Sequence, residues 1–154
     1  MMNKMFYYLT QGIGRGQTPL TSFDSALLSS GIANYNLVKI SSILPAGSSE
    51  CDTVSLKEGS ILHTAYASLT SNQEGATISA AVGVAIPQDE DKVGVIMEYS
   101  SCCSKQEAIC QVNLMLQEAM ENRKCAIKEI KVVASETVVS QSGYITVFAS
   151  LSIW

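Results

Sequence analysis

Histidine and basic side chains are scarce in this sequence of 154 residues. It contains a single histidine, and its ten lysines and arginines are outnumbered by fourteen aspartates and glutamates, which gives a net charge of −4 at pH 7. A protein that binds nucleic acid needs a basic surface to neutralise phosphates, so this function class is excluded. The negative charge is compatible with a cationic substrate.

The cysteines lack the spacing of a metal site. No two of the five are separated as C-x-x-C, and only one histidine could complete a ligand set, so a zinc site is excluded. Their odd number, without a secretory context, indicates reduced thiols in a cytoplasmic protein. The five are Cys51, Cys102, Cys103, Cys110 and Cys125.

Long apolar runs are also missing. The opening Met1–Leu9 is too short for a signal peptide or a membrane span, and no later stretch reaches about eighteen uncharged apolar residues. We therefore expect a soluble protein with a single domain over residues 1–154. Apolar residues make up 47% of the chain and charged ones 16%, an excess of apolar surface that favours an oligomer.

The order of predicted elements is strand, helix, several strands, helix and two strands, which is typical of an α+β fold with a largely antiparallel sheet. The last two strands are expected to form a hairpin over Ser140–Gly143. The predicted helices run from Thr18-Pro19 to Gly31 and from Ser104 to about Lys124. The predicted strands are Met5–Thr10, Leu37–Ile40, a short one at Cys51–Val54, Ser60–Thr70, Ala76–Ile86, Val93–Tyr99, Ile127–Val139 and Tyr144–Trp154.

Three glycines alternate with other residues in Gly12–Gly16. A dinucleotide-binding fingerprint is excluded because position 17 is Gln17, and no Gly-Lys-Ser/Thr follows for a P-loop. The segment is therefore predicted to be a mobile turn.

Two acidic residues are of interest. Asp24 follows Phe23 in the first helix and by itself is typical of a solvated carboxylate. Glu98 shares one face of its strand with Gly94 and Ile96, an apolar setting in which desolvation would raise the pKa of the carboxyl. On helical spacing alone the apolar residues of the first helix, Leu20, Phe23, Leu27 and Leu28, are core.

A pair of serines, Ser41-Ser42, lies between the apolar strand Leu37–Ile40 and the apolar residues Ile43-Leu44-Pro45. We expect these hydroxyls to be at least partly buried. A buried hydroxyl costs free energy unless it has a partner, so a local function for the pair is expected.

The frame of this pair, Phe23–Pro45, resembles the self-processing segment of the pyruvoyl-dependent arginine decarboxylases. The similarity continues in the family's order over most of the chain, in Gln17–Leu20, Thr64–Tyr66, Ile78–Ala81, Ala85–Pro87 and Gly94–Tyr99. The resemblance implies a four-layer sandwich of helix, sheet, sheet and helix. It also implies an enzyme assembled as a homotrimer or a hexamer, with a role either in polyamine biosynthesis or in acid resistance.

The resemblance also implies a self-made cofactor. Ser42 would attack the carbonyl of Ser41, the chain would separate into residues 1–41 and 42–154, and Ser42 would become a covalent pyruvoyl group. By itself Asn36 is compatible with a turn amide bonded to backbone groups, but it matches an asparagine that polarises this carbonyl, and the resemblance favours that processing role. The pyruvoyl ketone would form a Schiff base with the substrate amine, and Glu98 matches the family's proton donor.

The implied substrate is L-arginine, with agmatine and carbon dioxide as products. Asp24 matches a carboxylate that binds the basic end of the substrate, and a carboxylate can hold a guanidinium through two parallel hydrogen bonds. Decarboxylation of another amino acid such as histidine remains an alternative, as does an unprocessed, non-catalytic trimer. The apolar positions that match the lining of the substrate slot are Leu20, Phe23, Leu27 and Ile43.

Overall fold

The computed structural model describes residues 4–140 and 142–154, and within them two helices and nine strands. The predicted short strand at Cys51–Val54 is wrong, because pairing with the first strand takes place at Ser49–Glu50 instead. The elements are β1 (Phe6–Gly16), α1 (Pro19–Ser29), β2 (Asn36–Lys39), β3 (Ile43–Leu44), β4 (Ser49–Glu50), β5 (Ile61–Ser71), β6 (Thr77–Pro87), β7 (Gly94–Ser101), α2 (Lys105–Asn122), β8 (Ile127–Val138) and β9 (Tyr144–Ile153).

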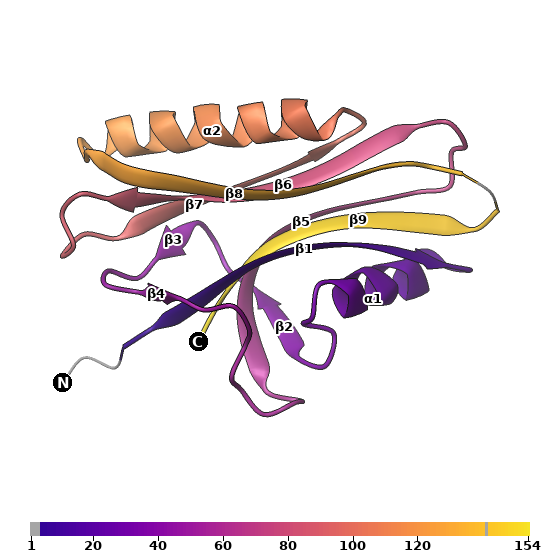
Figure 1. Ribbon diagram of the computed structural model, residues 1–154, viewed down its shortest axis with the longest axis horizontal. Coiled ribbons are helices and arrows are strands. Elements are labelled where there is room, and N and C mark those ends of the chain that lie inside the picture. Colours follow the sequence, from indigo (N-terminus) through magenta and orange to yellow (C-terminus); the bar gives the residue numbers. More distant parts are fainter. Residues whose placement is uncertain (1–3, 141) are drawn as a thin grey trace.

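These elements form four layers (Figure 1). Helix α2 covers the outer face of a four-stranded sheet of order β3-β7-β6-β8, and α1 covers the outer face of a five-stranded sheet of order β2-β5-β9-β1-β4. One apolar core lies between the sheets and a further core lies under each helix. The predicted α+β class is confirmed.

Antiparallel pairing dominates both sheets. Every pair in the four-stranded sheet is antiparallel, while β1 with β4 and β2 with β5 are parallel. Strand β9 is central, because it pairs with β1 on one side and β5 on the other.

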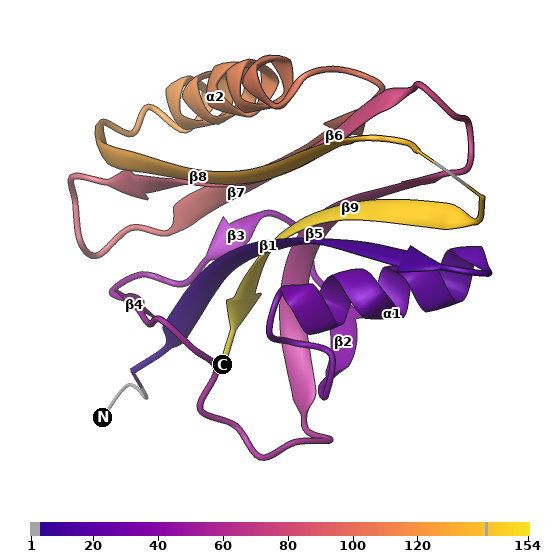
Figure 2. The same ribbon diagram turned by 45° about the vertical axis from the view of Figure 1, so that its right-hand side comes forward.

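The glycine segment Gly12–Gly16 is the second half of β1, so the prediction of a mobile turn is wrong. It pairs in continuous register with Tyr144–Phe148 of β9. The glycines face α1, and a Cβ at Gly14 would lie 2.5 Å from the carbonyl oxygen of Ser22 in that helix. Glycine is therefore required here for the close approach of helix to strand, not for a turn. Figure 2 shows α1 lying along this part of β1.

The boundaries of α1 match the prediction, and of its four predicted core residues Phe23 and Leu27 pack in the core while Leu20 and Leu28 do not. Thr18 caps the helix and shares a capping box with Thr21. Ser22 and Ala26 are fully buried against the glycines, whereas Leu20 and Leu28 remain 74% and 61% exposed. Small residues form the contact because the backbones are so close.

The two C-terminal strands do not pair with each other, so the predicted hairpin is wrong. Strand β8 pairs with β6, and β9 belongs to the other sheet. The physical reason is burial: β9 is apolar or small on both faces and needs cover from the opposite sheet and from α1. Gln141 of the predicted turn lies outside the described residues.

Over residues 4–140 and 142–154, neither α1 nor α2 has the length and apolar character needed to cross a membrane.

The close contact of β1 with α1 makes a testable prediction. Replacing Gly14 by alanine forces the helix away from the strand and should cost about 3 kcal/mol, or about 10 °C in the thermal unfolding midpoint. The control is Gly59→Ala: Gly59 has a positive φ (84°), which Gly14 does not have, but nothing lies within 4 Å of a Cβ added there. It should cost about 1 kcal/mol, or about 3 °C. Equal losses for the two variants would contradict the packing argument.

Candidate active site

The serine pair lies where the chain passes from one sheet to the other. Before it, β2 pairs with β5 in the five-stranded sheet, and after it β3 pairs with β7 in the four-stranded sheet. The N–H of Ile40 donates to the carbonyl of Thr64 at 3.2 Å, and the carbonyl of Ser42 accepts from the N–H of Ile96 at 2.8 Å. The peptide between Ser41 and Ser42 is thus anchored on its two sides by different sheets.

The two serines differ in burial. Ser42 is half-buried, as predicted, whereas Ser41 is exposed and its predicted burial is wrong. Ser41 projects to solvent because it has left the edge strand β2 and has not yet entered β3. Water can therefore reach the peptide bond at this position.

Glu98 lies close to this crossing. It follows Ile96, the residue that binds the Ser42 carbonyl, by two positions on β7, so the two side chains project from the same face of the strand. Ile96 is in the core between the sheets, and the Glu98 side chain is 31% exposed. Burial raises the pKa of Glu98 above its ordinary value, and the ammonium of Lys39, with Nζ 3.6 Å from Oε1, lowers it in part. The predicted direction of the shift is confirmed.

Lys39 is a site residue that sequence reasoning missed. Its Nζ lies 4.7 Å from the centre of the Tyr66 ring as well as beside Glu98. One signal in the sequence pointed to it: Lys39 is the single charge in the strand Leu37–Ile40, three residues before Ser42. Nothing local could have shown its partner, which lies 59 positions further along the chain.

An aromatic cluster connects α1 with Lys39. The ring centre of Phe23 lies 6.0 Å from that of Tyr66 and 5.8 Å from that of Phe148, which is fully buried. Leu27, 8% exposed, packs in the same core. Phe23 and Leu27, two of the apolar residues predicted for the substrate slot, therefore lie on the inner face of α1, and Phe23 contacts the Tyr66 ring that lies against Lys39.

The other predicted substrate residues are turned outward. Asp24 is exposed and, at intervals of four, shares the outer face of α1 with Leu20 and Leu28. Ile43 is 38% exposed and lies directly after Ser42, paired with Val95 of β7. These side chains face solvent in the single chain.

Asn36 begins β2, at the opposite end of that strand from the serine pair. Its side-chain amide donates to the carbonyl of Gly59 at 2.8 Å, and its N–H donates to the carbonyl of Ser60. In this arrangement the amide holds the loop before β5, which is the simpler of the two roles considered for it.

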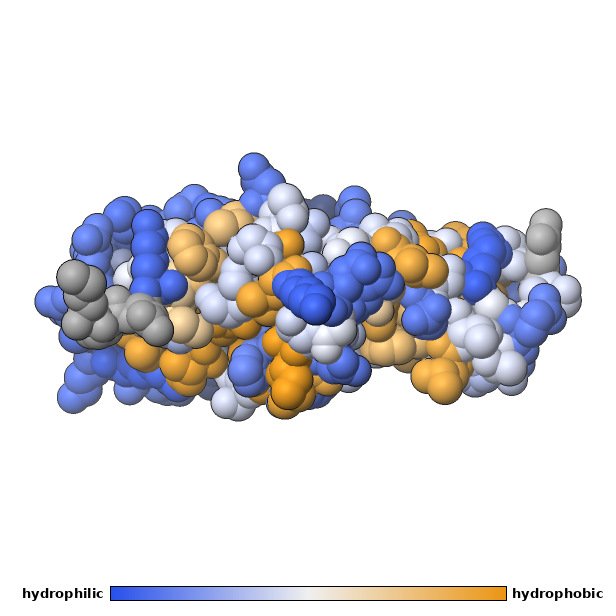
Figure 3. All heavy atoms as spheres, turned by 90° about the horizontal axis from the view of Figure 1, so that it is seen from below, coloured by the Kyte–Doolittle hydropathy of each residue, from blue (hydrophilic) through white to orange (hydrophobic). Residues whose placement is uncertain are grey.

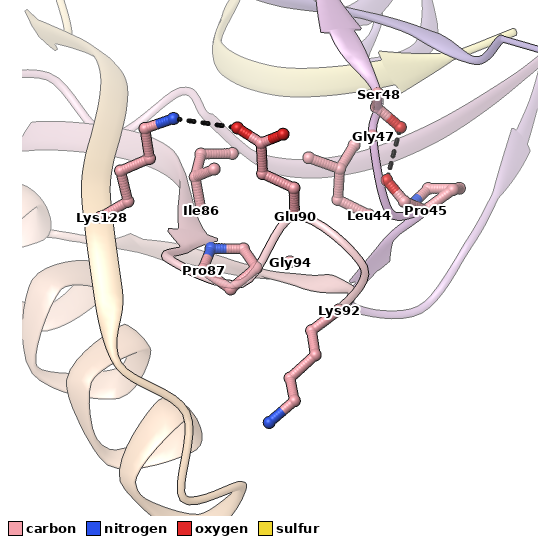
Figure 4. Close-up of a pocket in the computed structure, with 10 residues that line it drawn as sticks. All are labelled: Leu44, Pro45, Gly47, Ser48, Ile86, Pro87, Glu90, Lys92, Gly94 and Lys128. Atoms are coloured by element: carbon pink, nitrogen blue, oxygen red, sulfur yellow. Dashed lines mark hydrogen bonds and ion pairs between the residues drawn. The ribbon is translucent and has the colours of Figure 1, made fainter.

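A recess of about 240 Å³ opens beyond the other end of β3 (Figure 4). Its walls include Leu44, Pro45 and Gly94, and an ion pair between Lys128 Nζ and Glu90 Oε1 at 3.5 Å crosses it. None of the predicted site residues lines this recess. It is separate from the serine pair and Glu98.

The residues at the crossing fit a pyruvoyl group made from the chain itself. Ser42 supplies the hydroxyl that such a group requires, and the exposed position of Ser41 admits the water needed to complete its formation. Because each side of the peptide bond is hydrogen bonded to a different strand, both new ends would stay in place after a cut.

Comparison with known proteins agrees with this geometry. Residues 6–153 match the family model of pyruvoyl-dependent arginine decarboxylase. The chain is 41% identical to the pyruvoyl-dependent arginine decarboxylase of Methanocaldococcus jannaschii over 146 residues, which are 95% of this chain and 87% of the relative. It is 42% identical to the protein of that name from Pyrococcus abyssi over 126 residues, 80% of this chain and 79% of the relative. The chain therefore belongs to the pyruvoyl-dependent arginine decarboxylase family.

Proposed function

We propose that this protein converts L-arginine to agmatine and carbon dioxide in the cytoplasm, with a pyruvoyl group formed from Ser42. The observation that carries the proposal is the serine pair at the crossing between the sheets, next to a half-buried carboxyl whose pKa is raised. All five cysteines are unpaired, in keeping with a reducing compartment.

The group would arise by self-cleavage. The Ser42 hydroxyl attacks the carbonyl carbon of Ser41, and the peptide C–N bond breaks as an ester bond forms. Elimination then leaves a carboxylate on Ser41 and a double bond in residue 42, and addition of water releases ammonia and leaves a ketone. No oxidant is needed, because the sequence is redox-neutral within residue 42: Cα is oxidised to the ketone level while Cβ loses its oxygen and is reduced to a methyl group.

The two products, residues 1–41 and 42–154, would remain one folded unit. Strand β1 of the shorter piece pairs with β9 along Tyr7–Gly16 and with β4 at Phe6–Tyr7, and both partners belong to the longer piece. Strand β2 likewise pairs with β5. Dissociation would break these ladders and expose the core under α1, so the cut chain keeps its fold.

In the decarboxylation, the pyruvoyl ketone supplies an electron sink for an amine-bearing substrate as carbon dioxide leaves. The residues of this chain supply the proton. Glu98 is suited to donate it, because burial keeps the carboxyl protonated at a higher pH than an exposed glutamate. Its partial exposure lets it take up a new proton from solvent after each turnover.

The outward-facing residues support an assembly of copies, which we propose to be a homotrimer or a hexamer with the sites between neighbours. Exposed aliphatic side chains lie on β2, β3 and β5, namely Val38, Ile43 and Ile61. Figure 3, viewed from the α1 side, shows apolar patches interrupted by polar side chains. In such an assembly Asp24 would bind the guanidinium of arginine. The slot for the methylenes of the substrate would be lined by Leu20, Phe23, Leu27 and Ile43.

The deciding experiment is Ser42→Ala. Without the hydroxyl there is no attacking oxygen, so intact-mass spectrometry should find one uncut chain and a radiometric assay should find no agmatine. The control is Ser101→Ala, which changes the half-buried second serine of another pair and should leave cleavage and activity unchanged. Wild-type protein that stays uncut, or that releases histamine from histidine in place of agmatine from arginine, would contradict the proposal.

Glu98→Gln separates the two reactions. We expect it to cut itself as the wild type does but to lose about 10²- to 10⁴-fold in kcat, because the proton donor is gone. In the wild type, kcat should fall as the pH rises through the raised pKa of Glu98, since only the protonated form donates. The control is Glu90→Gln, a carboxyl that is 82% exposed in an ion pair of similar length. Full activity in Glu98→Gln would rule out the donor role.

Asp24→Asn tests the substrate assignment. The variant keeps hydrogen-bonding ability but loses the charge, so the KM for arginine should rise about 10- to 100-fold while cleavage stays complete. Asp52→Asn, an exposed aspartate in the loop after β4, is the control. An unchanged KM would show that Asp24 does not hold the guanidinium.

A further inference from the structure

We propose that Lys39 is a positioning residue, which holds the Glu98 carboxyl beside the serine crossing and, through its charge, sets the pH range over which that carboxyl carries a proton. The part of this inference that concerns catalysis rests on the proposed function above. The part that concerns the pairing of the two side chains does not.

The ammonium of Lys39 is held from two directions. Glu98 Oε1 lies 3.6 Å from its Nζ on one side, and the face of the Tyr66 ring lies 4.7 Å from it on another. The Tyr66 ring is itself packed against Phe148, with ring centres 5.5 Å apart. A lysine fixed in this way gives up the free rotation of an ordinary surface lysine, so its charge stays at one place.

The pair also joins side chains from the two sheets. Lys39 ends β2 and is paired with Thr64 in the five-stranded sheet, while Glu98 is on β7 in the other sheet. The ion pair therefore bridges the sheets at the same place where Ser41–Ser42 crosses between them. After a cut at that position, Lys39 would belong to the shorter piece and Glu98 to the longer one, so the pair would fasten the two together beside the new ends.

The surroundings of Glu98 leave Lys39 as its controlling charge. Strand β2 presents Lys39, β5 presents Tyr66 below the ammonium, and β6 places the uncharged Val82 next to Glu98 in register. Among the described residues, Lys39 is the charged group that acts on this carboxyl. Burial and Lys39 thus act in opposite directions on the pKa of Glu98, and removal of Lys39 leaves burial unopposed.

A second ion pair in the chain provides a matched comparison. Lys128 and Glu90 are 3.5 Å apart, and the exposure of the lysine, 57%, is close to the 54% of Lys39. The carboxyls differ, because Glu90 is 82% exposed and Glu98 is 31% exposed. Solvent screens the Lys128–Glu90 pair strongly and the Lys39–Glu98 pair less. Removal of the lysine should therefore change the titration of the partner carboxyl only at Glu98.

The experiment first measures the carboxyl itself, without catalysis. The full-length, uncut Ser42→Ala chain is labelled with ¹³C at the glutamate carboxyls, and the Glu98 signal is assigned by its loss in Glu98→Gln. We expect Lys39→Met to raise the titration midpoint of Glu98 by about half a pH unit or more, Lys39→Arg to restore it, and Lys128→Met to leave it unchanged. Lys39→Gln serves as a second neutral variant should Lys39→Met fold poorly.

The cut enzyme then provides the functional reading. In Lys39→Met, the pH at which kcat falls should rise by the same amount as the titration midpoint of Glu98. In Lys39→Arg, that pH should return to the wild-type value. A midpoint that does not move in either neutral variant overturns the inference, even if the enzyme is active. The two claims can also fail separately. If the titration midpoint moves but the wild-type protein neither cuts itself nor makes agmatine, the electrostatic effect of Lys39 on Glu98 is supported and the proposed function is overturned.

Discussion

Two backbone hydrogen bonds in different sheets hold the peptide between Ser41 and Ser42, one from Ile40 to Thr64 and one from Ile96 to Ser42. The rest of the site depends on this arrangement. A bond inside a regular strand could not be cut without disrupting its ladder, and a bond in a free loop would leave mobile ends. At the crossing, each end stays in its own sheet, so a cut can alter the chemistry of one residue while the fold is preserved.

The position of α1 depends on a constraint far from the serines. Gly12, Gly14 and Gly16 bring the helix backbone into contact with β1, and Ser22 and Ala26 are small for the same reason. This close contact sets the depth at which Phe23 reaches Tyr66, and Tyr66 in turn supports the ammonium of Lys39. A packing requirement on one side of the five-stranded sheet thus positions a charge at its edge.

Local patterns in the sequence predicted most of the elements and the environment of Glu98. Alternation along Val93–Tyr99 placed that carboxyl on the side of Ile96, and the capping box of Ser104 and Glu107 marked the start of α2. Local patterns could not show which sheet each of the last two strands joins, because that depends on partners distant in sequence. Local patterns also misassigned the glycines of β1, because alternating glycines are typical of a loop and only the packing of α1 explains them. Nor could they show the contact of Lys39 with Glu98, which are distant in sequence.

A proton donor has to meet two opposing demands, which the surroundings of Glu98 reconcile. It must hold its proton near neutral pH, which requires burial, and it must regain a proton after each turnover, which requires contact with water. A fully solvated carboxyl would be ionised, and one sealed in the core would exchange its proton slowly. With 31% of its side chain exposed and a lysine drawing its pKa back down, Glu98 lies between these extremes. Lys39, which limits the rise of this pKa, ends the strand that leads into the serine pair. It lies three residues before Ser42, so one short segment positions both the serine that would form the cofactor and the charge that adjusts the pKa of the proton donor.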